Sequence, residues 1–356
     1  MTALPTTAFD APAAWRGPEQ ARRDDWVYRL GPGDVRELDS AVQIAAARLD
    51  EGADLESLTL DDFPLDGLAR AIAGWMHELE TGRGFMLVRG VPVERYSARE
   101  NEIAYWGLGM HMGTPVSQNA AGDLLGHVRD TGADPRDPSI RLYKTRENLD
   151  FHCDGSDIVG LLCLRGARRG GASRISSSLA VYNEVLRRRP DLAPLLHEPF
   201  HWDRNEEQAE GEPPYFSLPV CFFDGEQLRT FYVGWYIRDA QRHAEVPRLT
   251  SAQTELLDLF DAIASDPSFY LEMELEPGDI QWLKNAVVLH ARTEFEDHPE
   301  PEHKRHLLRL WLTAHGHWTA ADSLLQGGIP ARDGVASDAD LAPAPPAENE
   351  SAAQRS

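Results

Sequence analysis

The feature that most constrains the fold is a succession of short strand-like runs, separated by turn residues, that begins near Gly126. We expect strands over 140–144, 149–154, 158–164, 173–177, 219–223, 229–237, 269–275, 280–283, 286–290 and 305–314. Many short strands without a regular strand–helix alternation are typical of sandwiches and jelly rolls and not of parallel α/β sheets.

Helical periodicity is confined to a few segments. Apolar residues recur at helical spacing over 61–80, and Ser97 with Glu100 three residues later has the pattern of a capping box that begins another helix. Two more helices are expected over 179–188 and 251–264. The predicted fold class is therefore mainly β with flanking helices, with a β-sandwich or jelly roll as its core.

Changes in composition predict three parts in the chain. Residues 1–25 are rich in Ala, Pro and Thr and are expected to form a loosely attached arm. Residues 26–325 are expected to form one jelly-roll domain, with a helical N-terminal part and lid insertions in loops such as 114–135 and 203–216. Residues 326–356 are rich in Ala, Pro, Asp and Glu and have no apolar periodicity, which is typical of a disordered tail.

The charge and composition restrict the classes of partner. The formal charge is −23, with 35 Lys and Arg against 58 Asp and Glu, and this argues against nucleic acid and anionic membranes. No apolar run approaches the roughly 18 residues of a membrane span, and no signal peptide is recognisable, so a cytoplasmic location is expected. The three cysteines, without a CxxC pair, indicate neither a disulfide framework nor a thiolate metal site.

An imidazole and a carboxylate stand two residues apart in Leu149-Asp150-Phe151-His152-Cys153-Asp154. In a strand, side chains two apart share a face, so His152 and Asp154 can bind one metal ion while Cys153 points away. His290 is the best candidate for a third ligand. Two His and one carboxylate, with other coordination positions open, are the ligand set of non-haem Fe(II) centres.

Two arginines stand on a strand that is too apolar to be an outer surface. Arg305 and Arg309 fall on one face of the run 305–314. Half-buried guanidinium groups require anions, and Arg binds carboxylates through two parallel hydrogen bonds. The alternative is a purely structural role, in which both arginines form salt bridges with Asp or Glu of the same chain.

These motifs, in this order, resemble the Fe(II)/2-oxoglutarate dioxygenases of the taurine dioxygenase (TauD/TfdA) family, which includes clavaminate synthase. The ordered set is His152-x-Asp154, Gly170-Gly171-Ala172-Ser173, Pro277-Gly278-Asp279, Asn285 with His290, and Arg305-x-x-x-Arg309. The resemblance covers roughly residues 80–318. The resemblance implies a double-stranded β-helix (jelly-roll) core with His152, Asp154 and His290 on the iron and with 2-oxoglutarate and O2 as co-substrates.

The resemblance also implies roles for residues around the metal. Arg305 would bind the distal carboxylate of 2-oxoglutarate, and Ser173, where the family more often has Thr, would hydrogen-bond the same molecule. Arg309 would lie beside the co-substrate and meet an anionic group of the substrate. Gln118 and Asn119 lie in a loop of the kind that lines the family's substrate pocket.

The predicted function is oxidation, by default hydroxylation, of a C–H bond in a small substrate that carries a carboxylate, such as an amino acid or a derivative, with release of succinate and CO2. Two alternatives remain open: a metal-dependent hydrolase or lyase on the same fold, and a non-catalytic cupin-like binding protein. The Arg305 and Arg309 pair favours the oxygenase, because a hydrolase needs no co-substrate clamp. The sequence does not determine the substrate, the reaction outcome, the lid or the oligomeric state.

Overall fold

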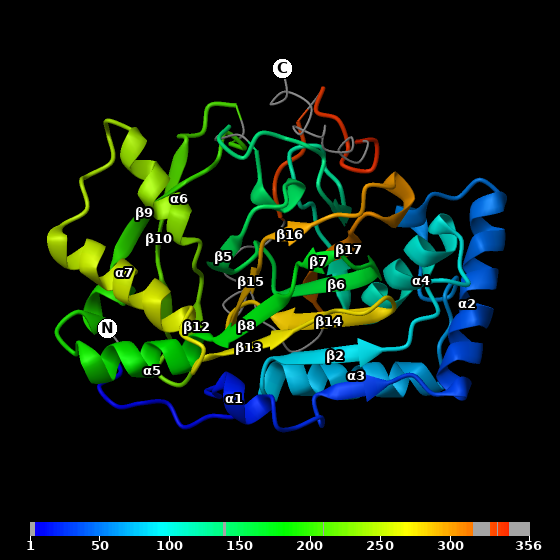
Figure 1. The fold of residues 1–356 in the computed structure, drawn as a ribbon, viewed down its shortest axis with the longest axis horizontal. Coiled ribbons are helices and arrows are strands. Elements are labelled where there is room, and N and C mark those ends of the chain that lie inside the picture. The colour runs from blue at the N-terminus through cyan, green and yellow to red at the C-terminus, as the bar shows by residue number, and fades with distance from the viewer. Residues whose placement is uncertain (1–3, 138–139, 209, 316–327, 333, 342–356) are drawn as a thin grey trace, which may run out of the picture.

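The computed structural model describes residues 4–137, 140–208, 210–315, 328–332 and 334–341 (Figure 1). Its larger sheet follows the order β1-β2-β14-β6-β17-β3, and β4 also pairs with β17. All neighbours except the parallel pair β1 and β2 are antiparallel. The strands are β1 (Val27–Arg29), β2 (Phe85–Arg89), β3 (Gly113–Pro115), β4 (Leu125–Val128), β6 (Ile158–Arg165), β14 (Asp279–Lys284) and β17 (His306–Ala314).

A smaller antiparallel sheet faces the larger one. Its order is β13 (Tyr270–Met273), β8 (Ser173–Ser177), β15 (Val288–Arg292) and β5 (Leu149–His152). Apolar side chains of both sheets form one buried cluster, including Leu87 and Trp311 from the larger sheet with Ile175 and Val288 from the smaller. Two sheets packed over a shared core, antiparallel except for the β1–β2 pair, form the predicted jelly roll, so the fold class is confirmed.

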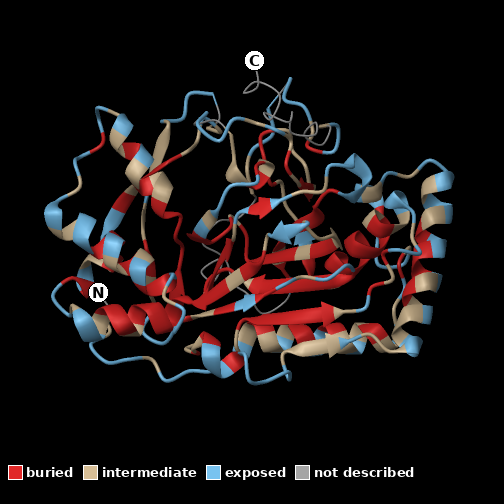
Figure 2. Cartoon of the chain, in the orientation of Figure 1, coloured by how far each residue is buried: buried red, intermediate tan, exposed pale blue. Residues whose placement is uncertain are grey.

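Helices cover the two outer faces of this core (Figures 1 and 2). One group packs its apolar side chains against the larger sheet: α2 (Pro32–Asp50), α3 (Gly67–Thr81) and α4 (Ala98–Met110). The second group packs near the smaller sheet: α5 (Ser178–Arg188), α6 (Gly234–Asp239) and α7 (Ser251–Ala264). The predicted capping box begins α4, because the Ser97 hydroxyl accepts from the Glu100 amide and the Glu100 carboxylate accepts from the Ser97 amide.

Short elements complete the described chain. A hairpin of β9 (Pro199–Asp203) and β10 (Tyr215–Pro219) carries the polar loop between them. Two small pairs join β11 (Cys221–Phe223) to β12 (Leu228–Thr230), and β7 (Arg169–Gly170) to β16 (Phe295–Glu296). A one-turn helix, α1 (Gly17–Gln20), lies near the N-terminus.

Two predicted strands were wrong. The segment 140–144 contains a 3-10 turn, Leu142–Lys144, because its amides bond to carbonyls three residues back instead of to a neighbouring strand. The segment 229–237 leaves β12 after Thr230 and becomes α6, whose apolar and aromatic residues pack as a helix. Helix α2 had not been predicted.

Both ends of the described chain contact the body. In the N-terminal part, the Trp15 indole donates to the Arg83 carbonyl at 2.9 Å. At the other end, Gly328 bridges to Ser117, and the buried Asp338 accepts from the Tyr143 hydroxyl at 2.5 Å. Residues 342–356 lie outside the described residues, and the division into arm, domain and tail stays a prediction.

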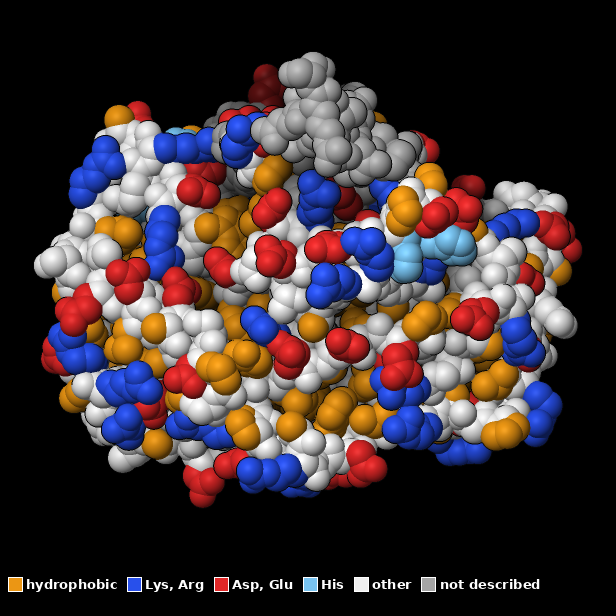
Figure 3. Space-filling view, viewed as in Figure 1, with side chains coloured by type: hydrophobic (Ala, Val, Ile, Leu, Met, Phe, Trp, Pro, Cys, Tyr) orange, Lys and Arg blue, Asp and Glu red, His pale blue; other side chains and the backbone are white. Residues whose placement is uncertain are grey.

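Acidic and basic side chains are intermingled on the face that Figure 3 shows, with small apolar patches between them. No helix among the described residues has the length and apolar character that a membrane span requires.

Candidate active site

Pairing of β5 with β15 brings the three predicted metal ligands together. His152 is the last residue of β5 and lies directly opposite His290 of β15. Asp154 follows two residues later, just beyond the strand, with its Oδ1 atom 3.7 Å from His152 Nε2 and its Oδ2 atom 3.7 Å from His290 Nε2. All three side chains are buried, and their ligand atoms lie within 4.8 Å of one another.

The turn after β5 is held by backbone contacts that fix Asp154. The Asp154 amide donates to Asn285 Oδ1 at 3.1 Å, and Asn285 Nδ2 donates to the Ser156 carbonyl at 2.8 Å. Cys153 points to the opposite side, with its thiol near the carbonyls of Thr230 and Asn285. Burial raises the pKa of Cys153 to about 12, so the thiol stays protonated and unreactive.

The protonation of the three ligands suits a divalent cation. Burial lowers the pKa of His152, and it lowers that of His290 to about 3, so both imidazoles are neutral near pH 7. His152 Nδ1 lies 2.8 Å from the Asp150 carbonyl, which can only accept, so the proton sits on Nδ1 and Nε2 is free to bind metal. Burial alone would raise the pKa of Asp154, but Arg309, the two histidines and the hydrogen bond from Trp311 together outweigh burial and lower the pKa to about 2.

These residues fit an iron ion. Metal bonds of about 2.1 Å from two ligands span roughly 4 Å, so separations of 3.7 Å leave room for one ion bonded to all three side chains. Two neutral imidazoles and one carboxylate on one side of the ion form the facial arrangement of non-haem Fe(II) oxygenases, which leaves positions open for other ligands.

A narrow cavity of about 50 Å³ extends from the triad between the two sheets and includes Ser173, Arg292, Arg305 and Arg309 in its lining. Arg305 precedes β17, and its buried Nη1 atom has no hydrogen-bond partner among the described residues. Burial lowers the pKa of Arg305 to about 10. Gly171 makes room for this side chain, because a Cβ atom there would lie 3.0 Å from Arg305 Nε.

Arg309 stands between the metal ligands and the chamber outside. Its Nη1 atom lies 3.6 Å from Asp154 Oδ2, and its Nε donates to Gln118 Oε1 at 2.7 Å. Its Nη2 atom is buried and has no partner within the described chain. The guanidinium group lies 4.5 Å from the Tyr143 ring centre and 4.9 Å from that of Trp311.

The remaining predicted residues have different surroundings. Ser173 lines the narrow cavity, and its hydroxyl donates to Gln281 Oε1 at 3.0 Å. Gln118 is fully buried and contacts Arg309, so it orients that guanidinium group from behind. Asn119 lies farther out, where its amide donates to Asp123 and Asp338.

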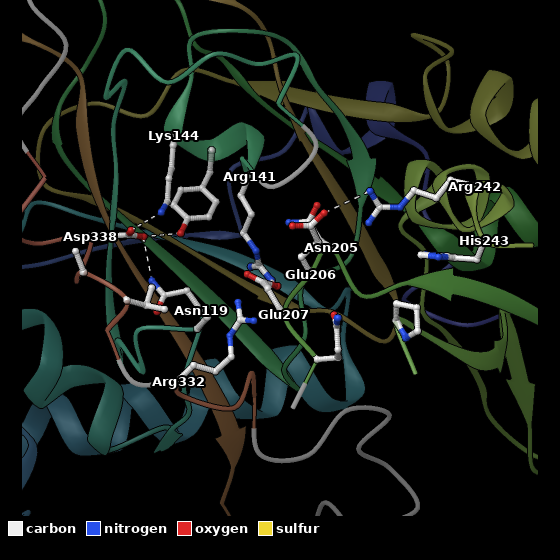
Figure 4. A pocket seen from close by; sticks show the side chains of 16 residues that line it. Asn119, Arg141, Lys144, Asn205, Glu206, Glu207, Arg242, His243, Arg332 and Asp338 are labelled. Atoms are coloured by element: carbon white, nitrogen blue, oxygen red, sulfur yellow. Dashed lines mark hydrogen bonds and ion pairs between the residues drawn. The ribbon is translucent and has the colours of Figure 1, made fainter. Parts of the chain in front are cut away.

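The triad opens outward into a chamber of about 390 Å³. Asn205 and Glu207, in the loop after β9, form part of its wall. Much of the remaining wall is aromatic and consists of Tyr143, Phe216, Phe231, Trp235, Tyr236 and Trp311. A second pocket of about 780 Å³ continues outward, and its polar side chains converge from five separate segments of the chain: 119–120, 141–144, 205–208, 242–243 and 332–338 (Figure 4). Arg141 and Glu207 form an ion pair at the boundary between the two spaces.

The sequence interpretation missed two residues of the site. The Trp311 indole donates to Asp154 Oδ2 at 2.8 Å, which orients the carboxylate from the side of β17. Arg292 stands two residues after His290 and lines the narrow cavity. Strand alternation from His290 and Arg309 could have identified both, because each lies two positions away on the same strand.

A family model described as "Taurine catabolism dioxygenase TauD, TfdA family" matches residues 48–311. FR-33289 synthase of Streptomyces rubellomurinus is 32% identical over 308 residues, which cover 84% of this chain and 88% of that protein. The taurine hydroxylase-like protein SAT17 of Stachybotrys chartarum is 32% identical over 310 residues, covering 83% and 77%. A uridine-5'-phosphate dioxygenase of an Amycolatopsis species is 28% identical over 178 residues, covering 47% and 62%.

Solved structures share the fold. An asparagine oxygenase in complex with Fe(II), 2S,3S-3-hydroxyasparagine and succinate superposes with a TM-score of 0.65 at 18% identity, covering 86% of this chain and 100% of that one. The non-haem iron oxygenase OrfP in complex with Fe and α-ketoglutaric acid gives a TM-score of 0.61 at 14% identity, covering 86% and 100%. The chain therefore belongs to the TauD/TfdA family, and the predicted class of iron- and 2-oxoglutarate-dependent dioxygenase is confirmed.

Proposed function

We propose that this protein hydroxylates a C–H bond of a small anionic substrate, an amino acid or a related compound, and that it consumes O2 and 2-oxoglutarate and releases succinate and CO2. The observation that supports this most directly is one continuous site. The His152–Asp154–His290 triad lies between a narrow cavity and a wider chamber with aromatic walls. The guanidinium groups that line the narrow cavity carry buried nitrogen atoms without a partner among the described residues. The two spaces suit two different ligands beside one ion.

Each side chain then has a defined task. His152, Asp154 and His290 would hold the iron, and Arg305 and Ser173 would bind the co-substrate in the narrow cavity. When bound, iron, 2-oxoglutarate and O2 would together supply an oxidant that can remove hydrogen from an unactivated C–H bond, with O2 as the source of the oxidising equivalents. The protein's own contribution is to orient the substrate and to exclude water from the reacting bond.

The anionic character of the substrate is supported by Arg309. Its buried Nη2 atom needs an acceptor, and the chamber outside brings Trp311 and Tyr143 alongside the guanidinium group. The ligands in the names of the similar proteins, uridine 5'-phosphate and 3-hydroxyasparagine, carry a phosphate and a carboxylate respectively. A carboxylate is the group that the chamber of this protein suits best, because a planar carboxylate can accept from Arg309 while its chain extends along the aromatic wall.

An anaerobic titration tests the co-substrate part of the proposal. Adding 2-oxoglutarate to the Fe(II)-loaded protein should produce a weak visible charge-transfer band, and His152→Ala should abolish it. His201→Ala is a suitable control, because His201 lies on β9 and is absent from the lining of the metal site. Absence of the band in the unmodified protein would refute the proposal.

The substrate part needs a separate assay. Succinate release should be scored against a panel of amino acids, their N-acylated and hydroxylated derivatives, and matched amides that lack the carboxylate. We expect turnover only of compounds that carry the carboxylate. We also expect Arg309→Met to reduce this turnover by a larger factor than it reduces the affinity for 2-oxoglutarate. Equal turnover of an acid and its amide would contradict an anionic substrate.

A further inference from the structure

A second buried arginine faces the co-substrate cavity. Arg292 lies two residues after His290 in β15, so both side chains project from the same face of the strand. Only 6% of the Arg292 surface is exposed. Its Nη2 atom donates to the Glu147 carbonyl, whereas its Nε and Nη1 atoms are buried without a partner among the described residues.

Arg292 and Arg305 approach the same place from different strands. Both guanidinium groups pack against the Phe295 ring, with their central carbons 4.9 Å and 5.1 Å from the ring centre. Both side chains line the cavity that contains His290. Three buried N–H-bearing atoms of this pair, Nε and Nη1 of Arg292 and Nη1 of Arg305, therefore lack acceptors within the described chain.

Nearby carboxylates attract this pair electrostatically but do not supply acceptors to its unpartnered nitrogens. Asp130 accepts from the Gly132 amide, and Asp297 accepts from the backbone amide of Arg305. Neither carboxylate accepts from the guanidinium nitrogens that lack partners. Two like charges held together in a buried space destabilise the empty site, and each buried donor without an acceptor adds a further cost. An anion with several acceptor positions would remove both costs.

We propose that Arg292 and Arg305 together bind the distal carboxylate of the 2-oxo acid, one guanidinium group from β15 and one from the start of β17. The inference rests on the proposed function and deepens it by assigning Arg292 a role in co-substrate binding. A carboxylate has about four acceptor positions, enough to accept from both groups. The arrangement selects 2-oxo diacids, because a monoacid would leave the paired cations buried and unsatisfied.

A merely structural role for Arg292 predicts a different result. Arg292 also connects β15 to the segment before β5, because it donates to the Glu147 carbonyl. In addition, its guanidinium group packs on the Phe295 ring. If that were its whole role, removing the guanidinium group would weaken every ligand of the cavity alike. If Arg292 contacts the distal carboxylate, only ligands with that carboxylate are affected. Two ligands of nearly equal shape separate these cases: 2-oxoglutarate, and 2-oxopentanoate, which has a methyl group in place of the distal carboxylate.

The experiment is calorimetric and spectral titration of the anaerobic Fe(II)-loaded protein with both compounds, in the unmodified protein and in Arg292→Met. We expect Arg292→Met to weaken 2-oxoglutarate binding about 10- to 100-fold, as for loss of a charged hydrogen bond, and to change 2-oxopentanoate binding less than about threefold. Arg174→Met is the matched control, because Arg174 lies on the neighbouring strand β8 and pairs outward with Glu272. It should change neither affinity.

The double variant sharpens the test. If both guanidinium groups contact one carboxylate, the effects of Arg292→Met and Arg305→Met on 2-oxoglutarate binding will not multiply, and the double variant will bind both compounds with similar affinity. Equal weakening of both compounds in Arg292→Met, or no weakening of either, would overturn the inference. Failure of the unmodified protein to bind 2-oxoglutarate would instead refute the proposed function itself.

Discussion

Trp311→Phe should weaken metal binding without removing any metal ligand. The Trp311 indole donates to Asp154 Oδ2 at 2.8 Å in a buried site, and Phe keeps an aromatic ring beside Arg309 while losing the donor. A hydrogen bond to a buried charged group contributes about 1.5–3 kcal/mol, and about 1.4 kcal/mol corresponds to a tenfold change in affinity. Residues that orient a metal ligand typically change metal affinity about 10- to 100-fold, which agrees with that range.

The assay is a competition titration of the metal-free protein with Fe(II), or with Mn(II) as an air-stable probe, against a chelator of known affinity. Trp282→Phe is the matched control: Trp282 is fully buried in β14 of the same sheet, and its indole nitrogen has no partner within the described residues. This control should lower stability through lost packing but leave metal affinity unchanged. If Trp311→Phe bound metal as tightly as the unmodified protein, the indole would not orient Asp154 and the reasoning would be refuted.

Three further predictions concern stability and the edges of the site. Burial lowers the pKa of both His290 and His306 to about 3, below the ordinary 6.5, so the unfolded chain binds more protons between these values. The metal-free protein should therefore lose about 1.4 kcal/mol of stability per pH unit for each of the two groups as pH falls below about 6.5, and a flat profile of unfolding free energy against pH would contradict this. Gly171→Ala places a Cβ atom 3.0 Å from Arg305 Nε at a φ of +75°, and should cost about 1–2 kcal/mol and weaken 2-oxoglutarate binding in the spectral titration. Gly211→Ala, at a φ of +83° with open space around it, should weaken folding alone. Asp338→Ala removes the acceptor for Tyr143 and the ion pair with Lys144, so limited proteolysis should cut 328–341 faster, whereas Asp340→Ala should not change the cleavage rate.

Local patterns predicted the parts of the molecule that depend on local physics. The capping box at Ser97 and the helical periodicity over 251–264 produced helices where they were expected, because capping and amphipathic burial act over a few residues. The alternation around His152 placed the thiol of Cys153 away from the metal, although Asp154 lies beyond the strand end. Arg309 was expected on a half-buried strand, and its side chain is buried beside Asp154.

Other features depend on contacts that sequence spacing does not encode. The run 229–237 was read as a strand because it is apolar and aromatic, but packing against the body bends it into α6 after Val233. Gln118 looked like a residue of a polar loop, yet it is fully buried behind Arg309, since β17 passes close to residue 118 only in the folded sheet. The aromatic wall of the chamber likewise combines segments about 170 residues apart.

Residues 305–311, at the start of β17, include three side chains of the candidate active site. Arg305 directly precedes β17 and lines the narrow cavity, Arg309 also lines the chamber, and the Trp311 indole donates a hydrogen bond to Asp154. The outer wall of the chamber, by contrast, includes residues such as Ile140, Asn205 and Ile329 on connecting segments. Substitutions in those segments can reshape substrate choice while the chemistry is left intact. Attempts to redirect this enzyme to new compounds should therefore vary the connecting segments and leave β17 untouched.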